Sequence, residues 1–463
     1  MDAFSEQLVD RLPLACATLE LFDFAFDPRL IGGLYDDHRG RCYTDLLSFP
    51  RLLELVRDCL LQHGGSGHRL FLELQRRDAE PVDESNFYRK LARMPVAVSR
   101  ALLRTCTARL AELMTLRATL LPVCFEPFAV VVVDGKKIKN ASARLKPTRP
   151  YRGALLAAKA LVAMDARSGL ALAMSDSLDG EANDVPLVGE LLPQVRQVIG
   201  RAVLWLADRQ FADPATLRRL LERDGEGDPD PDHFAVRVRQ GLKFAAESER
   251  VLSDERGRTV IDQVGVFGSG KAALRLRRVT LVRPGEEDVV LLTDLMDQKA
   301  FDASDLLKLY RRRWGIEQMF QQVTETFALE HLIGCSPRAV LFQFALCLLM
   351  YNLVQAVKGF VAEDGKVEVS IVSTYGLFYD IKRELCAWAY LGEGELRRSP
   401  RDATAMRQRL RELLKGSWDP VAYTKASDKK PRDRPQRQPL HGGHSSVQRL
   451  LEGKVKLKKH VSK

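Results

Sequence analysis

The sequence predicts a mixed α/β fold, because the spacing of its apolar residues changes near residue 125. Before that point apolar residues recur at helical intervals, as in residues 46–62 and 98–120. After it, short apolar runs come first and then alternate with helical stretches. Strands followed by alternating helices and strands are typical of a sheet covered by helices. We therefore expect an all-helical N-terminal region followed by a mixed sheet.

The helical region spans residues 1–122, and two short helices within it suggest DNA binding. Helical patterns at residues 68–77 and 84–94 are separated by a segment that ends in Asp83, a residue type that caps helices. The second pattern is basic and aromatic, with Tyr88, Arg89, Lys90 and Arg93. A helix-turn-helix is one interpretation, and a helical hairpin with a solvated basic face is the other.

Residues 123–222 are predicted to form the first part of the mixed sheet. The run at 128–133 is continuously apolar, as expected of a strand buried on both faces. Asp213-Pro214 has the cap and first-position residues of a helix. The remaining predicted elements are strands at 153–164, 170–175 and 202–207 and a helix at 185–199.

A β-rich insertion is predicted at residues 223–300, and a helical completion of the core at 301–420. The insertion opens with a Gly-, Pro- and Asp-rich linker and contains the predicted strands 234–239, 259–267, 273–282 and 289–295. Within the helical part, residues 339–357 carry no charge over nearly the length needed to cross a bilayer. Three polar residues inside this run favour a buried core helix, so we expect no membrane association: Gln343, Asn352 and Gln355.

The basic charge of the chain is concentrated at its end. The formal net charge is +10, and residues 421–463 contain twelve Lys or Arg and three Asp or Glu, which gives this tail +9. Its composition predicts disorder. Such a tail either contacts nucleic-acid phosphates or serves as a solubilising end. The eight cysteines form no CxxC pair, which disfavours a zinc site and a disulfide framework and suits a reducing cytoplasm.

Two aspartates follow predicted strands and are candidate ligands of a metal ion. Asp134 ends the apolar run and precedes Lys136 and Lys137, which could meet phosphate from a basic loop. The alternative is a hairpin turn, because Asp134-Gly135 is a strong turn signal. Asp208 follows the strand 202–207 and precedes Arg209. The alternative there is a helix cap, although Asp213 already suits that role.

Glu317 is the third candidate ligand. Helical spacing from Tyr310 places four residues on one stripe: Tyr310, Arg313, Glu317 and Thr324. An exposed Arg313–Glu317 ion pair is the alternative interpretation. A carboxylate flanked on its own face by Arg and Tyr also suits a metal ligand beside bound DNA.

The order of these motifs resembles the IS4-type family of DDE transposases. The resemblance rests on Tyr310-x2-Arg313-x3-Glu317 following Asp134 and Asp208-Arg209-Gln210-Phe211, and it spans about residues 125–360. It implies a ribonuclease-H-like mixed-sheet catalytic core in which Asp134, Asp208 and Glu317 bind two Mg²⁺ or Mn²⁺ ions. Thr324 stands where the family has a lysine, and Gln210 where it has a glycine.

The resemblance also implies partners and roles. Two metal ions would assist cleavage of a phosphodiester and joining of the freed end to target DNA. The expected partners are double-stranded DNA at the element ends and the target, and a second copy of the chain during synapsis, in a bacterial cytoplasm at the nucleoid. The predicted DNA-contacting residues are Tyr310, Arg313, Thr324, Lys136, Lys137 and Arg209. The alternatives are a nuclease of the same fold that does not join, and a catalytically silent DNA-binding descendant.

One glycine-rich segment imitates a nucleotide-binding loop. Residues 265–272 nearly fit the phosphate-loop spacing, but Ala272 replaces the Ser or Thr that would hold Mg²⁺. A strand pattern follows instead of a helix. We therefore expect a hairpin turn here and regard an ATPase as a remote alternative.

Overall fold

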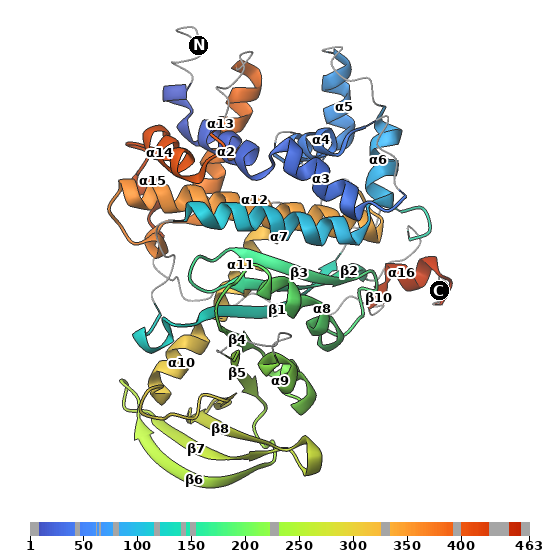
Figure 1. Ribbon diagram of the computed structural model, residues 1–463. Helices are drawn as coiled ribbons and strands as arrows, with labels where there is room; N and C mark the ends of the chain where they lie inside the picture. Colours follow the sequence, from blue (N-terminus) through green and yellow to red (C-terminus); the bar gives the residue numbers. More distant parts are fainter. Residues whose placement is uncertain are drawn as a thin grey trace, which may run out of the picture.

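The computed structural model describes most of the chain in a helical layer, a large twisted sheet and a curled β-rich end (Figure 1). The described residues are 9–41, 47–61, 63, 66–76, 83–114, 121–139, 145–148, 154–222, 231–325, 334–391, 400–425 and 444–454.

The centre of the sheet is formed by five strands in the order β3-β2-β1-β4-β5. These are β1 (Ala129–Lys139), β2 (Ala154–Asp165), β3 (Ala171–Ser177), β4 (Val203–Ala207) and β5 (His233–Val238). Strands β1, β2 and β3 pair antiparallel, whereas β4 is parallel to both β1 and β5. The four strands predicted for residues 123–222 are confirmed, with β1 extending six residues further than expected (139−133).

The β-rich block predicted at 223–300 continues this sheet. β5 pairs with β4 on one side and with β9 (Val289–Thr293) on the other. Beyond β9 follow β8 (Leu274–Leu281), β7 (Thr259–Phe267) and β6 (Phe244–Ser253). The sequence analysis missed β6, because nearly all of its side chains are exposed and no apolar alternation marks it.

Buried side chains cover both faces of the central strands. In β1 and β4, Val130, Val132, Leu204 and Leu206 belong to a core shared with the helical layer. Their neighbours Val131 and Val133 point the other way, into a second core with Trp205. That second core is closed by α8 (Val185–Arg196) and α9 (Pro214–Leu221). This alternation decides the face on which residues just past the strand ends lie.

The N-terminal helices do not form a core of their own. They comprise α2 (Pro13–Ala25), α3 (Pro28–His38), α4 (Phe49–Leu61), α5 (Gly67–Arg76), α6 (Glu84–Arg93) and α7 (Val96–Leu113). These helices pack in one hydrophobic cluster with α12 (Pro337–Asp364), α13 (Thr374–Leu391) and α14 (Ala403–Leu413). Arg409 of α14 also binds the buried Glu20 of α2, 3.1 Å apart. The first 122 residues are therefore structurally joined to the region 301–420.

The two helices of the predicted helix-turn-helix are α5 and α6. Asp83 caps α6 as expected, since its carboxylate accepts a hydrogen bond from Asn86 N at 2.7 Å. The connection at residues 77–82 lies outside the described residues. Phe87 and Leu91 are buried, and Lys90 Nζ donates to the carbonyl of Leu47. DNA binding by this pair stays a prediction.

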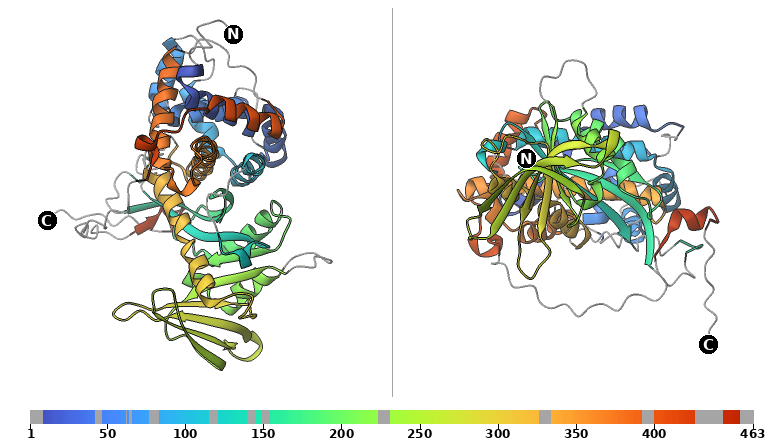
Figure 2. Two further views of the ribbon diagram at one scale, coloured as in Figure 1. Left: turned by 90° about the vertical axis from the view of Figure 1, so that its left-hand side faces the viewer. Right: turned by 90° about the horizontal axis from the view of Figure 1, so that it is seen from below.

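Helix α12 is long and apolar enough to cross a membrane, but its most apolar window is entirely buried inside the protein. The expected core helix at 339–357 is confirmed. Helix α12 runs alongside α7 across one face of the sheet (Figures 1 and 2). Its Asn352 amide ties the layers together by bonding Ala171 of β3 and the Thr107 hydroxyl of α7.

Part of the basic tail is ordered, which contradicts the prediction that all of residues 421–463 are disordered. Residues His444–Ser446 form β10, which pairs in parallel with Ala154–Leu156 of β2. Helix α16 (Val447–Leu451) follows, and Arg449 bonds the carboxylates of Asp179 and Glu181. Strand pairing and a buried Val447 supply the order that the composition did not predict. Residues 426–443 and 455–463 lie outside the described residues.

The phosphate-loop look-alike is a hairpin turn, as expected. Strand β7 ends at Phe267 and β8 begins at Leu274, and the turn between them places Gly268 at φ +87° and Gly270 at φ +57°. Glycine tolerates this left-handed backbone, which is the reason for the glycine-rich spacing.

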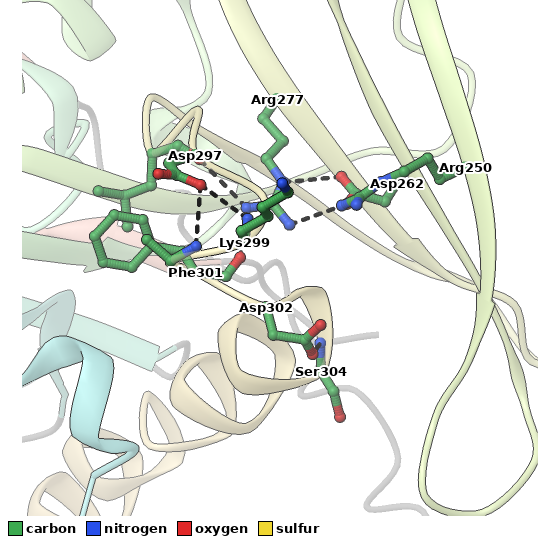
Figure 3. A network of polar contacts seen from close by, with 10 residues as sticks. Arg250, Asp262, Arg277, Asp297, Lys299, Phe301, Asp302 and Ser304 are labelled. Atoms are coloured by element: carbon green, nitrogen blue, oxygen red, sulfur yellow. Dashed lines mark hydrogen bonds and ion pairs between the residues drawn. The ribbon is translucent and has the colours of Figure 1, made fainter.

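A buried ionic network attaches the β-rich end to the following helix (Figure 3). Arg277 of β8 is wholly buried and donates to both oxygens of Asp262 of β7, at 2.8 and 3.0 Å. Its Nη1 donates hydrogen bonds to the carbonyls of Leu295 and Phe301. These two carbonyls lie in the segment between β9 and α10 (Ala303–Arg311), so the network fixes where α10 begins.

Candidate active site

Asp134 and Asp208 lie side by side where the parallel pairing of β1 with β4 ends. Val133 of β1 is the register partner of Ala207 in the parallel strand β4, and each aspartate is the next residue. By strand alternation each shares a face with the residue two positions earlier, Val132 or Leu206. Both carboxylates therefore face the side on which the helical layer packs.

The Asp134-Gly135 pair is part of a strand, so the hairpin alternative is wrong. Asp134 is paired with Val162 and Gly135 with Leu161, and β1 continues to Lys139. The expected basic loop is likewise wrong, because Lys136 and Lys137 are strand residues that point to opposite faces. Lys137 is exposed, whereas Lys136 Nζ lies 5.6 Å from the centre of the Phe320 ring.

Asp208 has no capping role, as its sequence context suggested. It precedes a short 3₁₀ turn, Arg209–Phe211, but its side chain makes no capping hydrogen bond. Helix α9 is capped by Asp213, whose carboxylate accepts from Ala215 N and Thr216 N. The carboxylate of Asp208 is thus not used by the local backbone.

Glu317 reaches these aspartates from a helix on the same side of the sheet. The predicted single helical stripe is interrupted, because α10 ends at Arg311 and α11 spans Trp314–Glu325. At the break, Arg313 N bonds the carbonyl of Tyr310 at 3.0 Å, an i to i−3 bond of the tighter 3₁₀ type. The buried face of α11 consists of Ile316, Met319, Phe320 and Val323.

Arg313 is the centre of the cluster. Its Nη2 lies 2.6 Å from Glu317 Oε1, and its Nη1 lies 3.8 Å from Asp134 Oδ2. Burial acts to lower the pKa of the guanidinium, but Tyr310, Glu317 and, electrostatically, Asp208 outweigh it and raise that pKa. The side chain is only 9% exposed. The Arg313–Glu317 ion pair considered above exists, but it is part of a cluster with both aspartates.

Tyr310 supports the cluster from inside the protein. Its hydroxyl donates to the carbonyl of Ala207 at 3.4 Å, directly before Asp208, and its ring lies 5.8 Å from the Arg313 guanidinium. The side chain is buried. DNA contact by Tyr310 stays a prediction; in this structure its hydroxyl is bound to the strand end directly before Asp208, which suits a positioning role.

The environment of Asp134 disfavours its charge. Burial raises the pKa of Asp134 to about 6, and the carboxylates of Glu317 and Asp208 contribute to the rise. The backbone N–H of Gly135, 2.8 Å from Oδ1, and the Arg313 guanidinium act in the opposite direction. A buried carboxylate near two others is stabilised in its charged form more by a divalent cation than by the single positive charge of an arginine.

The three carboxylates suit a hard divalent cation, but in this structure they do not lie close enough together to coordinate one. Carboxylate oxygens are the ligands that Mg²⁺ and Mn²⁺ prefer. Within the described residues, no three His, Cys, Asp or Glu side chains approach closely enough to form a ready-made metal site. Arg313 is the counter-ion of these carboxylates instead, so a metal ion would have to compete with its guanidinium.

Two further predicted DNA-contacting residues have intramolecular partners. The Thr324 hydroxyl donates to the carbonyl of Phe320 at 2.6 Å, within its own helix, and the side chain is half-buried. Arg209 is exposed, and its guanidinium lies 3.7 Å from the exposed carboxylate of Glu287. Both side chains can therefore give up these partners and bind a DNA phosphate instead.

The sequence analysis missed an ion pair on the reverse side of β1. Lys159 of β2 lies 2.7 Å from Asp184, and both side chains are almost fully buried. A Cβ atom on Gly135 would lie 2.2 Å from Asp184 Oδ1, so only glycine fits beside Asp134. Asp184 precedes helix α8 and has the sequence of a cap, but it makes no capping bond. Nothing in the linear pattern could therefore distinguish its actual role.

The central part of the chain is similar to known proteins. Residues 126–353, which include all three candidate carboxylates, match the family described as "Transposase DDE domain". A protein of Sinorhizobium fredii (strain NBRC 101917 / NGR234), "Putative transposase y4zB", is 29% identical over 119 residues. That match covers 25% of this chain and only 33% of the relative's length. A piggyBac transposase synaptic complex with hairpin DNA, solved by cryo-EM, is 13% identical, with a TM-score of 0.41 over 90% of this chain and 88% of that one.

Proposed function

We propose that this protein is a DNA transposase whose reaction centre is formed by Asp134, Asp208 and Glu317. The proposal starts from the transposase DDE domain at residues 126–353. One observation carries it further. Glu317 and Asp134 lie 2.6 and 3.8 Å from the Arg313 guanidinium, and Asp208 acts on it electrostatically, although these acidic residues are separated by 74 (208−134) and 109 (317−208) positions.

The mixed sheet supports the ribonuclease-H-like core that the resemblance implies. Its central strands follow the order β3-β2-β1-β4-β5, antiparallel for the first three and parallel for the rest. Asp208 then follows the carboxyl end of β4, and Asp134 follows the last residue of β1 that pairs with β4. Ligand sites of α/β sheets are found near the carboxyl ends of parallel strands. Tyr310, Arg313 and Glu317 complete the motif from α10 and α11.

The three carboxylates would hold two Mg²⁺ or Mn²⁺ ions. When bound, such ions activate the attacking oxygen and stabilise the leaving oxygen of an in-line phosphodiester displacement. The protein's own contribution is to hold the aspartates rigidly on paired strands and to bring Glu317 over them. Arg313 would then exchange its carboxylate partners for a DNA phosphate, with which it can form a bidentate contact.

Double-stranded DNA is the proposed substrate, both as element end and as target. Joining two ends to one target requires two reaction centres, so we expect two copies of the chain in the synaptic complex. A nuclease of the same fold would cut but leave the freed 3′-hydroxyl unjoined. A silent DNA-binding descendant would do neither.

The test uses linear DNA that spans the gene and its flanks, incubated with purified protein and Mg²⁺. Wild type is expected to cut at the element ends and to join them to a second DNA, while Asp134→Asn, Asp208→Asn and Glu317→Gln do neither. Asp213→Asn is the matched control, because this nearby carboxylate only caps α9. Cutting without joining would favour the nuclease. Wild-type activity in the Glu317→Gln variant would refute the proposed centre.

A further inference from the structure

A basic cavity lies beside Glu317 on the adjoining face of α11. It has a volume of about 320 Å³ and is bounded by α11, α12 and the segment around Thr374. Trp314, Gln318 and Gln322 line it at intervals of four residues. Gln318 is the residue after Glu317 and lies about 100° further around the helix. The cavity and the candidate reaction centre therefore share one helix but different faces of it.

Lys358 is the buried charge in this cavity. Its side chain is 6% exposed, and its Nζ lies 3.3 Å from the hydroxyl of Thr374. Thr374 is a neutral partner that also accepts from the Gln355 amide at 3.5 Å. Tyr351, Gln355 and Lys358 follow one another at helical spacing, which makes a polar stripe on the otherwise apolar α12.

The charges around this lysine have the same sign as its own. Arg311, Arg312 and Lys425 line the cavity with Lys358, and no Asp or Glu is found among its described lining residues. Burial, together with nearby Lys425, lowers the pKa of Lys358 to about 7. A buried ammonium without a carboxylate is costly, and cations gathered around it add repulsion. An anionic ligand would remove both costs.

We propose that this cavity binds a phosphate group, with Lys358 at its floor and Arg311, Arg312 and Lys425 around it. Phosphate suits the site because it is compact, carries charge and accepts hydrogen bonds from ammonium and guanidinium groups together. Following the proposed function, its source is the backbone of DNA bound across α11. A free phosphorylated compound has the same chemistry and is distinguished by experiment.

The first arm measures duplex DNA binding without divalent cations, as a function of salt. Lys358→Met should weaken binding roughly tenfold and reduce the salt slope by about one, because one phosphate contact is lost. Lys425→Gln, at an exposed position, should act in the same direction. Lys415→Gln is the matched control, since Lys415 is an exposed lysine that does not line the cavity.

The second arm measures stabilisation of the folded protein by inorganic phosphate. The wild type is expected to gain thermal stability, and Lys358→Met to gain none. Loss of phosphate stabilisation with unchanged DNA affinity would overturn DNA as the source. If Lys358→Met changed neither the DNA affinity nor the stabilisation by phosphate, the phosphate site itself would be overturned. If the wild-type protein bound no DNA at all, the proposed function would be refuted. The stabilisation measurements with inorganic phosphate would then still show whether the cavity binds phosphate.

Discussion

Arg313 and Glu317 lie one helical turn apart, and the guanidinium of the first is 2.6 Å from the carboxylate of the second. The same guanidinium is 3.8 Å from Asp134, which lies within β1 directly after the last residue that pairs with β4. A side chain that was expected to grip DNA is therefore also the counter-ion of the proposed metal ligands. This double use makes cation binding and DNA binding interdependent.

The first prediction concerns that competition. Arg313→Gln should tighten Mn²⁺ binding in the absence of DNA by at least about tenfold, because opposite charges about 4 Å apart interact by about 4 kcal/mol at an effective dielectric constant of 20. Titration of free Mn²⁺ by electron paramagnetic resonance measures this. Arg209→Gln is the control, as Arg209 pairs with exposed Glu287. Equal Mn²⁺ affinity in wild type and Arg313→Gln would contradict the counter-ion role.

The second prediction concerns the pH dependence of stability. Since burial raises the pKa of Asp134 to about 6 from 3.8, the protonated form favours folding, and this contribution is lost as pH rises through 6. Asp134→Asn should therefore raise the free energy of unfolding at pH 7.5 by up to about 3 kcal/mol, from about two pKa units. The gain should vanish near pH 3.5. Urea unfolding at both pH values tests this, and a gain that is independent of pH would refute it.

The third prediction concerns the buried network that fixes α10. Asp262→Ala leaves Arg277 buried without a carboxylate and should cost about 3–5 kcal/mol of unfolding free energy. Glu247→Ala breaks the exposed pair with Arg275 and should cost less than about 1 kcal/mol. Denaturant unfolding compares the two. Similar losses would mean that the network adds nothing beyond a surface ion pair.

The fourth prediction separates the two parts of the tail. Truncation after residue 454 keeps β10 and α16 but removes Lys456, Lys458 and Lys459. It should leave thermal stability unchanged, weaken binding to all DNA sequences alike and flatten the salt dependence. Truncation after residue 443 should in addition lower stability, because it uncovers the edge of β2. If truncation after residue 454 left the DNA affinity unaltered, the terminal lysines would serve solubility and not DNA binding.

The fifth prediction concerns the position at which the family has a lysine. Thr324 offers only a neutral hydroxyl, now bonded to Phe320 within α11. Thr324→Lys should tighten binding to cleaved element ends, because a charge-assisted bond is roughly twice as strong as a neutral one. End-binding and strand-transfer assays measure this beside Lys136→Ala. A strong effect of Lys136→Ala alone would place the phosphate contact on β1. No effect of either variant would contradict the placement of DNA along α11.

The sequence by itself determined the elements that carry the candidate centre. The apolar run before Asp134 predicts a buried strand, and helical spacing places Ile316, Met319, Phe320 and Val323 on the buried helical face that the structure shows. Asp83 and Asp213 mark helix starts correctly because capping is a local interaction. The resemblance added the choice of Asp134, Asp208 and Glu317, and the structure gathers these residues around one arginine.

Only the tertiary structure decided which segments share a sheet and which charges share a pocket. Strand β6 has no burial pattern, and β10 follows a stretch with the composition of a disordered tail, so their pairing depends on partners far away in the chain. Tyr310 bonds the backbone of Ala207, 103 residues earlier. Lys358 of α12 lines one cavity with Arg311 of α10 and with Lys425 only because these distant segments pack together. Such contacts join residues distant in sequence, and periodicity is a local property that cannot encode them.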